Sequence, residues 1–193
     1  MKRFQLEHII RAGGSIADDE EIIVLGSSSI LAQFPNISEE VLVSIEADVF
    51  PKNKPDMADL IDGCIGELSP FHQAFGYYAH GVGKETAGNL PRGWDRRLFP
   101  IRNENTGGVT GFCLEIHDLA AGKYVAGRKK DLQFISSLIA HGMVKHKTLL
   151  RRIEKLEISM KLKEKIRQRI MADFKKAKSR GTVSEAMTQQ KAY

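Results

Sequence analysis

Cysteine is scarce in this sequence. Cys64 and Cys113 are the two present, and they lie far apart with no CxxC motif. This spacing excludes a disulfide framework and a zinc knuckle. We therefore expect both cysteines to be ordinary core residues.

Long apolar runs are also missing. The longest, such as 22–25 and 41–43, fall far short of the roughly 18 residues that span a bilayer. Near the N-terminus, Glu7 and His8 interrupt the apolar stretch that a signal peptide requires. We expect a cytoplasmic protein without a membrane span.

The residues that are present match the average of soluble folded proteins. Of the 193 residues, 42% are hydrophobic and 27% are charged, which fits neither a disordered chain nor a fibrous one. The length allows one domain, or one domain with an appendage.

Charge is divided unevenly along the chain. Residues 1–145 contain 15 Lys or Arg against 19 Asp or Glu, a balance of −4, whereas residues 146–193 contain 14 against 5, a balance of +9. Binding of a polyanion should therefore depend first on the C-terminal part.

Hydrophobic periodicity predicts a mixture of helices and strands. Helices are expected over 4–14, 27–34 (capped by the serines at 27–29), 56–68, 117–127, 128–142 and 147–178, and strands over 21–26, 42–50, 75–83, 97–103 and 109–116. The segments 117–127 and 128–142 are either two helices or one helix kinked at Gly127. The polar end, 179–193, is expected to fray or to be disordered.

Two carboxylates stand out in the strand expected over 42–50. Glu46 and Asp48 are two positions apart, so their side chains leave the same face of a strand, with Cα atoms roughly 6.5 to 7 Å apart. Such neighbours repel each other unless a divalent cation lies between them, and Mg²⁺ prefers oxygen ligands of this kind. The alternative is a solvated acidic face without a metal.

A glycine and serines come between the first strand and the next helix. Gly26 has no side chain to obstruct a ligand, and Ser27 and Ser28 follow it at the expected start of a helix. Backbone N–H groups at such a turn favour phosphate binding.

This order of features resembles the nucleotidyltransferase superfamily of DNA polymerase β. Its motif is a strand ending in Gly-Ser, a helix, and a strand with two acids in an acid-x-acid pattern, which Gly26, Ser27, Glu46 and Asp48 match. Glu46 stands where most members have aspartate. The resemblance implies a metal held by Glu46 and Asp48 and a nucleotide bound at 26–28.

A second motif is similar to that of the abortive-infection, type IV toxin branch of the superfamily. Lys123, Arg128 and Asp131 match its K-x4-R-x2-D pattern. The resemblance implies that Lys123 and Arg128 contact phosphates and that Asp131 orients them. The alternative is a basic helix surface with ordinary ion pairs.

The third carboxylate of the superfamily normally comes from a later strand. Glu115 is the candidate because strand periodicity could turn it toward the same site, while Glu104 and Asp95 lie in expected turns. His72, His80 and His117 lack metal-ligand spacing and are interpreted as structural, with His117 and Asp118 capping the next helix. Trp94, Tyr77 and Tyr78 stay unassigned.

The resemblance implies an α+β nucleotidyltransferase fold with a small mixed sheet, flanking helices and a long basic C-terminal helix. The expected parts are a nucleotidyltransferase domain (1–146), a basic helical extension (147–178) and the tail (179–193). The implied activity is Mg²⁺-dependent transfer of a nucleoside monophosphate from an NTP to an acceptor. An RNA such as tRNA is the implied acceptor, with a protein or a small molecule as the alternatives, and an antitoxin is the implied protein partner. The alternative function is a catalytically inactive binding module.

Overall fold

A mixed sheet of five strands organises the N-terminal part of the chain. The computed structural model describes residues 1–190, with side chains described as far as residue 179. The strands are β1 (Glu21–Val24), β2 (Glu46–Pro51), β3 (Tyr78–Gly81), β4 (Phe99–Ile101) and β5 (Thr110–Cys113). Their order is β3-β2-β1-β5-β4. β1 is antiparallel to β2 and parallel to β5, while β3 is parallel to β2 and β4 antiparallel to β5.

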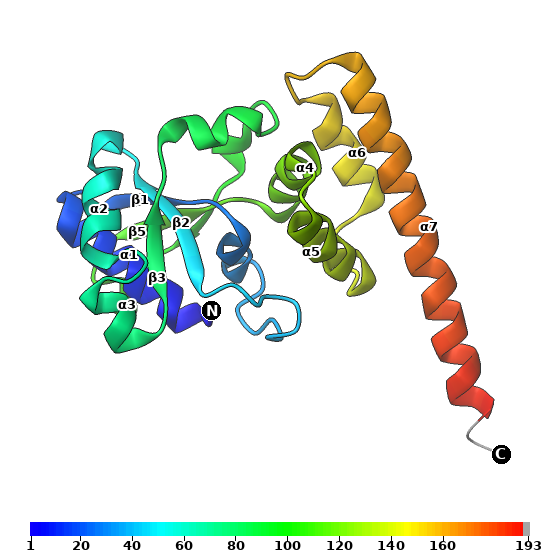
Figure 1. Cartoon of the computed structure of the whole chain (residues 1–193), viewed down its shortest axis with the longest axis horizontal. Coiled ribbons are helices and arrows are strands. Elements are labelled where there is room, and N and C mark those ends of the chain that lie inside the picture. The colour runs from blue at the N-terminus through cyan, green and yellow to red at the C-terminus, as the bar shows by residue number, and fades with distance from the viewer. Residues whose placement is uncertain (191–193) are drawn as a thin grey trace.

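Two groups of helices flank this sheet (Figure 1). The first group is α1 (Arg3–Ala17), α2 (Ala58–Ile65) and α3 (Pro70–Phe75). The second group is α4 (Ile116–Ala126), α5 (Lys129–Ala140), α6 (His146–Glu154) and α7 (Met160–Gln190). Figure 1 shows α7 running beside α5 and α6 and then projecting away from the rest of the chain. The expected α+β class with a small mixed sheet and flanking helices is confirmed.

Aliphatic side chains form the core between α1 and the sheet. Leu6, Ile9 and Ile10 of α1 are fully buried. A Cβ atom at Gly111 of β5 would lie 2.3 Å from Cδ1 of Ile10. The absence of a side chain at Gly111 therefore lets α1 pack closely on the sheet.

The connection between β1 and β2 differs from expectation. The segment after Gly26 is a 3-10 helix, η1 (Ser27–Ala32), and no side chain caps it. β2 starts at Glu46 rather than at residue 42, because Val41 and Leu42 are buried in the connecting loop instead of alternating along a strand. A helix does follow Gly26 as expected, but the expected serine cap and the expected start of the strand were both wrong.

The expected long helix over 147–178 is a pair of helices. α6 ends at Glu154, and α7 begins at Met160 after Ser159, whose side chain accepts a hydrogen bond from the backbone N–H of Leu162. The apolar stripe is shared between the two helices: Leu149 and Ile153 of α6 and Ile166 and Ile170 of α7 are all buried. α7 runs past residue 178 to Gln190, and the rest of the expected frayed tail lies outside the described residues.

The two cysteines were both expected in the core. Cys113 is buried as expected, but Cys64 is exposed and is not a core residue. Within residues 1–190, no helix combines the length and the apolarity that crossing a membrane requires.

A buried carboxylate ties the second group of helices together. Asp118 of α4 is 0% exposed and accepts two hydrogen bonds from Arg97, at 2.7 and 3.0 Å. Nε of Arg152 on α6 lies 2.9 Å from Oδ1 of Asp118, an ion pair outside hydrogen-bond geometry. One carboxylate thus joins η4 (Trp94–Arg97), α4 and α6.

Replacing this carboxylate should destabilise the protein strongly. Asp118→Ala leaves two guanidinium groups without their buried partner, which costs about 3–5 kcal/mol of unfolding free energy. Asp95→Ala removes an exposed carboxylate of η4, two residues before Arg97, and should change stability by less than about 0.5 kcal/mol. Urea unfolding of both variants measures the difference. Equal midpoints would show that the ion cluster does not hold the helices.

Candidate functional site

β2 carries Glu46 and Asp48 on one face. Both side chains line the same cleft, and Ala47 between them is fully buried on the opposite face. The side chains of Glu46 and Asp48 are 37% and 27% exposed. The alternation of the strand therefore places both carboxylates at the cleft, as their spacing predicted.

The neighbouring strand adds a tyrosine and a histidine. In the parallel β2–β3 pair, Tyr78 is the register partner of Glu46 and His80 is the partner of Asp48. The hydroxyl of Tyr78 donates to Oε2 of Glu46 at 3.1 Å. Nδ1 of His80 lies 3.1 Å from Oδ1 of Asp48 and 3.7 Å from Oε1 of Glu46.

Gly26 stands directly against the Asp48 carboxylate. A Cβ atom at position 26 would lie 1.9 Å from Oδ2 of Asp48, and Gly26 has a φ of +62°. The backbone N–H of Leu25 donates to the carbonyl of Asp48 at 2.8 Å. Only glycine combines this left-handed backbone with room for the carboxylate.

The surroundings of Asp48 affect its protonation. Burial, followed by repulsion from Glu46, raises the pKa of the Asp48 carboxyl above its usual value, and His80 offsets part of this rise. Burial and then the hydrogen bond to Glu46 raise the pKa of Tyr78 to about 12. Burial is the larger cause of both shifts, and the negative charge of Glu46 adds to it.

The serines after Gly26 are placed differently from one another. Ser27 lines the cleft. Ser28 is fully buried and its hydroxyl has no hydrogen-bond partner, while the hydroxyl of Ser29 donates to the carbonyl of Gly26 at 2.8 Å. Of the two expected nucleotide-binding serines, Ser27 is at the cleft and Ser28 is not among its lining residues.

The residues of the second motif form one cluster. Asp131, whose side chain is 1% exposed, accepts from Nζ of Lys123 at 2.8 Å and from Nε of Arg128 at 2.6 Å. Burial alone would raise the pKa of Asp131, but hydrogen bonds from Arg128 and Lys123 outweigh it and hold the pKa below its usual range. Asp131 thus fixes both cations.

The cations of this cluster differ in how they can act. The side chain of Lys123 is 13% exposed and its ammonium lies 5.1 Å above the ring of Phe134. The side chain of Arg128 is 62% exposed. Hydrogen bonding to Asp131 raises the pKa of Arg128, and the charges of Asp48 and Glu46 raise it further.

A single cleft unites the two motifs. Its volume is about 1090 Å³, and its lining includes Glu46, Asp48, Lys123, Arg128 and Asp131. These residues come from β2 and from the loop and helices around 123–131, which are far apart in sequence. The cleft can therefore present acidic and basic groups to one ligand, and its volume suits a nucleotide-sized molecule.

Glu115 does not belong to this site. β5 ends at Cys113, and Glu115 caps α4 by accepting from the backbone N–H of Asp118. Its carboxylate lies 2.5 Å from Nδ1 of His117 and 3.5 Å from Arg152, and it does not line the cleft. The expectations that Glu115 faces Asp48 and that His117 and Asp118 cap α4 were both wrong.

His80 and Tyr78 are the residues that sequence reasoning missed. His80 was interpreted as structural, yet it lies beside Asp48 on the strand that follows β2 in the chain. The available signal was the pattern itself: Tyr78-Ala-His80 repeats the polar-Ala-polar spacing of Glu46-Ala-Asp48, and the central alanines are paired and fully buried.

The donor groups fit a divalent cation. Among the described residues, one ligand atom each from Glu46, Asp48 and His80 lie within 4.8 Å of one another. Carboxylate oxygens suit Mg²⁺ and Mn²⁺, whereas imidazole nitrogen also suits transition metals. The raised pKa of Asp48 is consistent with a site that gains from a bound cation.

Comparison with known families adds an independent finding. A family model described as "Nucleotidyltransferase of unknown function (DUF6036)" matches residues 3–181. Comparisons with curated proteins and with solved structures gave no match.

Adding a methyl group at position 26 should disrupt the site. Gly26→Ala forces a Cβ into the Asp48 carboxylate and puts alanine at a φ of +62°, so we expect a loss of about 1–3 kcal/mol in stability. The matched control is Gly63→Ala in α2, where an added Cβ meets nothing within 4 Å and should stabilise the helix by up to about 1 kcal/mol. Urea unfolding measures both. If Gly26→Ala were as stable as the control, Gly26 would not be in contact with Asp48.

Removing the charge of Asp48 should stabilise the metal-free protein. Folding raises the pKa of Asp48, so ionisation of this carboxyl lowers the free energy of unfolding. The stability is fully present below the unfolded pKa and is lost as the pH rises through the folded pKa. In EDTA, the melting temperatures of wild type and Asp48→Asn should converge near about pH 3. At pH 7 the variant should melt higher, by roughly 2–4 °C per kcal/mol for a chain of this length. Asp95→Asn, an exposed control, should show no such divergence, and a lower melting temperature for Asp48→Asn at pH 7 would contradict the repulsion.

Proposed function

The chain belongs to this nucleotidyltransferase family, and from that premise we propose Mg²⁺-dependent transfer of a nucleoside monophosphate from an NTP to an acceptor. The observation that carries the proposal is the cleft in which Glu46 and Asp48 meet the cations held by Asp131. In the reaction, an acceptor hydroxyl loses its proton to solvent water and its oxygen bonds to the α-phosphorus. The bond from that phosphorus to the bridging oxygen breaks, and pyrophosphate leaves with the electron pair.

Glu46, Asp48 and His80 would hold the cation. When bound, Mg²⁺ would offset negative charge on the phosphates and on the attacking oxygen. Tyr78 keeps Glu46 in position through its hydrogen bond, and Gly26 gives Asp48 the space it occupies. These protein groups are in place before any ligand arrives, which reduces the cost of organising the site.

Arg128 and Lys123 would stabilise the triphosphate and the departing pyrophosphate. Arg128 is the more accessible of the two and responds to the charge of the acidic pair, so it is the better candidate for direct phosphate contact. Lys123 is tied to Asp131 and is largely buried. Ser27 lines the same cleft and offers a hydroxyl and a backbone N–H for a phosphate.

An RNA, such as a tRNA end, is the acceptor we propose. The support is the resemblance to the type IV toxin branch and the excess of Lys and Arg in residues 146–193. An antitoxin protein as partner rests on that resemblance alone.

A binding module without catalysis is the second candidate. The observation that favours it is that His80, and not a carboxylate, is the residue that a later strand places beside Asp48. Imidazole can bind a metal or accept a proton, but it carries no negative charge to stabilise a second cation. The two candidates differ in turnover and agree in metal-dependent nucleotide binding.

Incubation with labelled NTPs tests the proposal. Wild type with Mg²⁺ and total cellular RNA should transfer label from at least one NTP into RNA, whereas EDTA or Asp48→Asn should abolish the transfer. Loss of a metal ligand of this kind lowers turnover by a factor on the order of 10² or more. Asp48→Asn is expected to be at least as stable as wild type without metal, so unfolding cannot explain its inactivity.

Two other results are informative. Wild-type turnover in Asp48→Asn would refute the metal assignment. Mg²⁺-dependent NTP binding without transfer to any acceptor would favour the binding module.

A further inference from the structure

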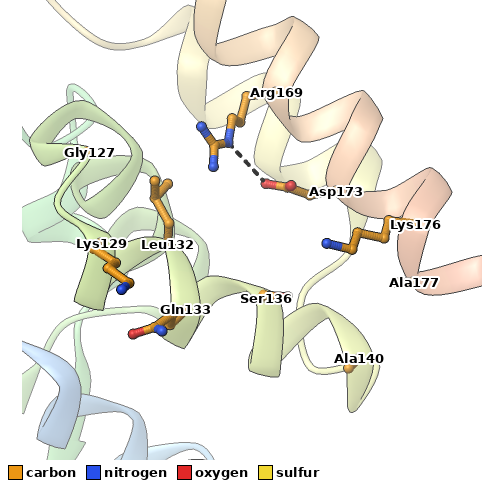
Figure 2. A pocket seen from close by; sticks show the side chains of 10 residues that line it. All are labelled: Gly127, Lys129, Leu132, Gln133, Ser136, Ala140, Arg169, Asp173, Lys176 and Ala177. Carbon is orange, nitrogen blue, oxygen red and sulfur yellow. Dashed lines mark ion pairs between the residues drawn. The ribbon is translucent and has the colours of Figure 1, made fainter. Parts of the chain in front are cut away.

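A second cavity lies between α5 and α7. Its volume is about 640 Å³. The residues that line it are Gly127, Lys129, Leu132, Gln133, Ser136 and Ala140 from the α5 side and Arg169, Asp173, Lys176 and Ala177 from α7. Figure 2 shows Lys176 reaching from α7 toward α5, with Lys129 and Gln133 on the facing helix.

Two of its cations are free to bind a ligand. Within the described part of the chain, the ammonium groups of Lys129 and Lys176 have no ion pair or hydrogen bond, and both residues are exposed. The one acid, Asp173, already accepts a hydrogen bond from the Tyr124 hydroxyl at 2.9 Å and lies 3.9 Å from Nε of Arg169. The cavity thus has three cations against one engaged carboxylate.

The two cavities share one wall. Gln133 lines both of them. About one turn farther along α5, Ser136 lines the α5–α7 cavity and Ser137 lines the larger cleft. A chain-like ligand could therefore cross α5 at Gln133 and occupy both. The exposed glutamine amide at the crossing can donate or accept hydrogen bonds.

The charges of the two cavities are opposite. The lining of the larger cleft contains six carboxylates, Glu40, Glu46, Asp48, Asp62, Glu67 and Asp131, against three cations, Lys123, Arg128 and Lys130. A polyanionic acceptor would be repelled there, apart from the segment at the bound cation. Cations in the adjoining cavity would supply the attraction that the larger cleft lacks.

We propose that the α5–α7 cavity binds the phosphodiester backbone of a single-stranded acceptor and leads it over α5 to the larger cleft. This inference rests on the proposed function and adds the place where a single-stranded acceptor binds and the residues that hold it. Lys129 and Lys176 contact phosphates as unpaired cations, and Gln133 lies where the strand crosses. A single strand suits the site because its backbone is flexible enough to bend over a helix.

Paired lysine variants test the proposal. Lys129→Ala/Lys176→Ala removes the two free cations of the cavity. Lys165→Ala/Lys175→Ala removes two exposed lysines of α7 that do not line it and matches the change in net charge. The probe is a fluorescent 12-nucleotide single-stranded RNA, with binding measured by anisotropy across a salt series. Binding of each variant to an NTP with Mg²⁺ is measured separately.

The expected result separates the two variants. Lys129→Ala/Lys176→Ala should weaken RNA binding about tenfold at low salt. The slope of the logarithm of the binding constant against the logarithm of the salt concentration should become shallower by about 1.4, because each of the two lost phosphate contacts contributes roughly 0.7. The control should change both quantities clearly less, and NTP binding should be unchanged in both variants.

Equal effects of the two variants on RNA binding would overturn the proposal while leaving the nucleotide site intact. Polyglutamate serves as a second probe. If Lys129→Ala/Lys176→Ala lost binding to polyglutamate but kept binding to RNA, the proposal would also be overturned, because the cavity would then bind an acidic polypeptide. Absence of Mg²⁺-dependent NTP binding in wild type would count against the proposed function instead.

Discussion

The contact between Gly26 and the Asp48 carboxylate is the constraint on which the site depends. β1 ends beside β2, so the turn after β1 passes where the carboxylate of Asp48 stands. Gly26, with its positive φ, makes this turn possible, and the turn confines Asp48 next to Glu46. The arrangement keeps two like charges together, and the raised pKa of Asp48 is the cost that the metal-free fold bears for it.

The rest of the cleft is organised around a second buried carboxylate. Asp131 pairs with Lys123 of α4 and with Arg128 at the start of α5, so one carboxylate positions both cations across the α4–α5 junction. Asp118 has a similar role farther along, because its ion pairs with Arg97 and Arg152 attach α6 to α4. α7 packs against α6 and α5, and the cavity between α5 and α7 adjoins the cleft at Gln133.

Much of the fold was predictable because its signals are local. The buried run over 21–26, the same-face spacing of Glu46 and Asp48 and the interruption at Gly127 each depend on residues close in sequence. The division of the C-terminal helix was not predictable from its apolar stripe, since the same spacing serves one long helix or two that pack together. Ser159 at the start of α7 was the local sign of the break.

The missed part of the site depends on long-range pairing. His80 acquires its position only because β3 pairs with β2 in a register that places it opposite Asp48. Periodicity also suggested that Glu115 could face the site, but β5 ends at Cys113 and Glu115 is instead the N-cap of α4. A strand's end, like its partner, is decided by packing that a single sequence does not display.

A crystal structure with Mn²⁺ and a non-hydrolysable NTP analogue tests the central proposal most directly, since Mn²⁺ can be located by anomalous scattering. The account predicts an anomalous peak within about 2.5 Å of carboxylate oxygens of both Glu46 and Asp48, with His80 beside it and the phosphates between that peak and Arg128. A peak at another cluster, or a nucleotide bound outside the cleft, would contradict it.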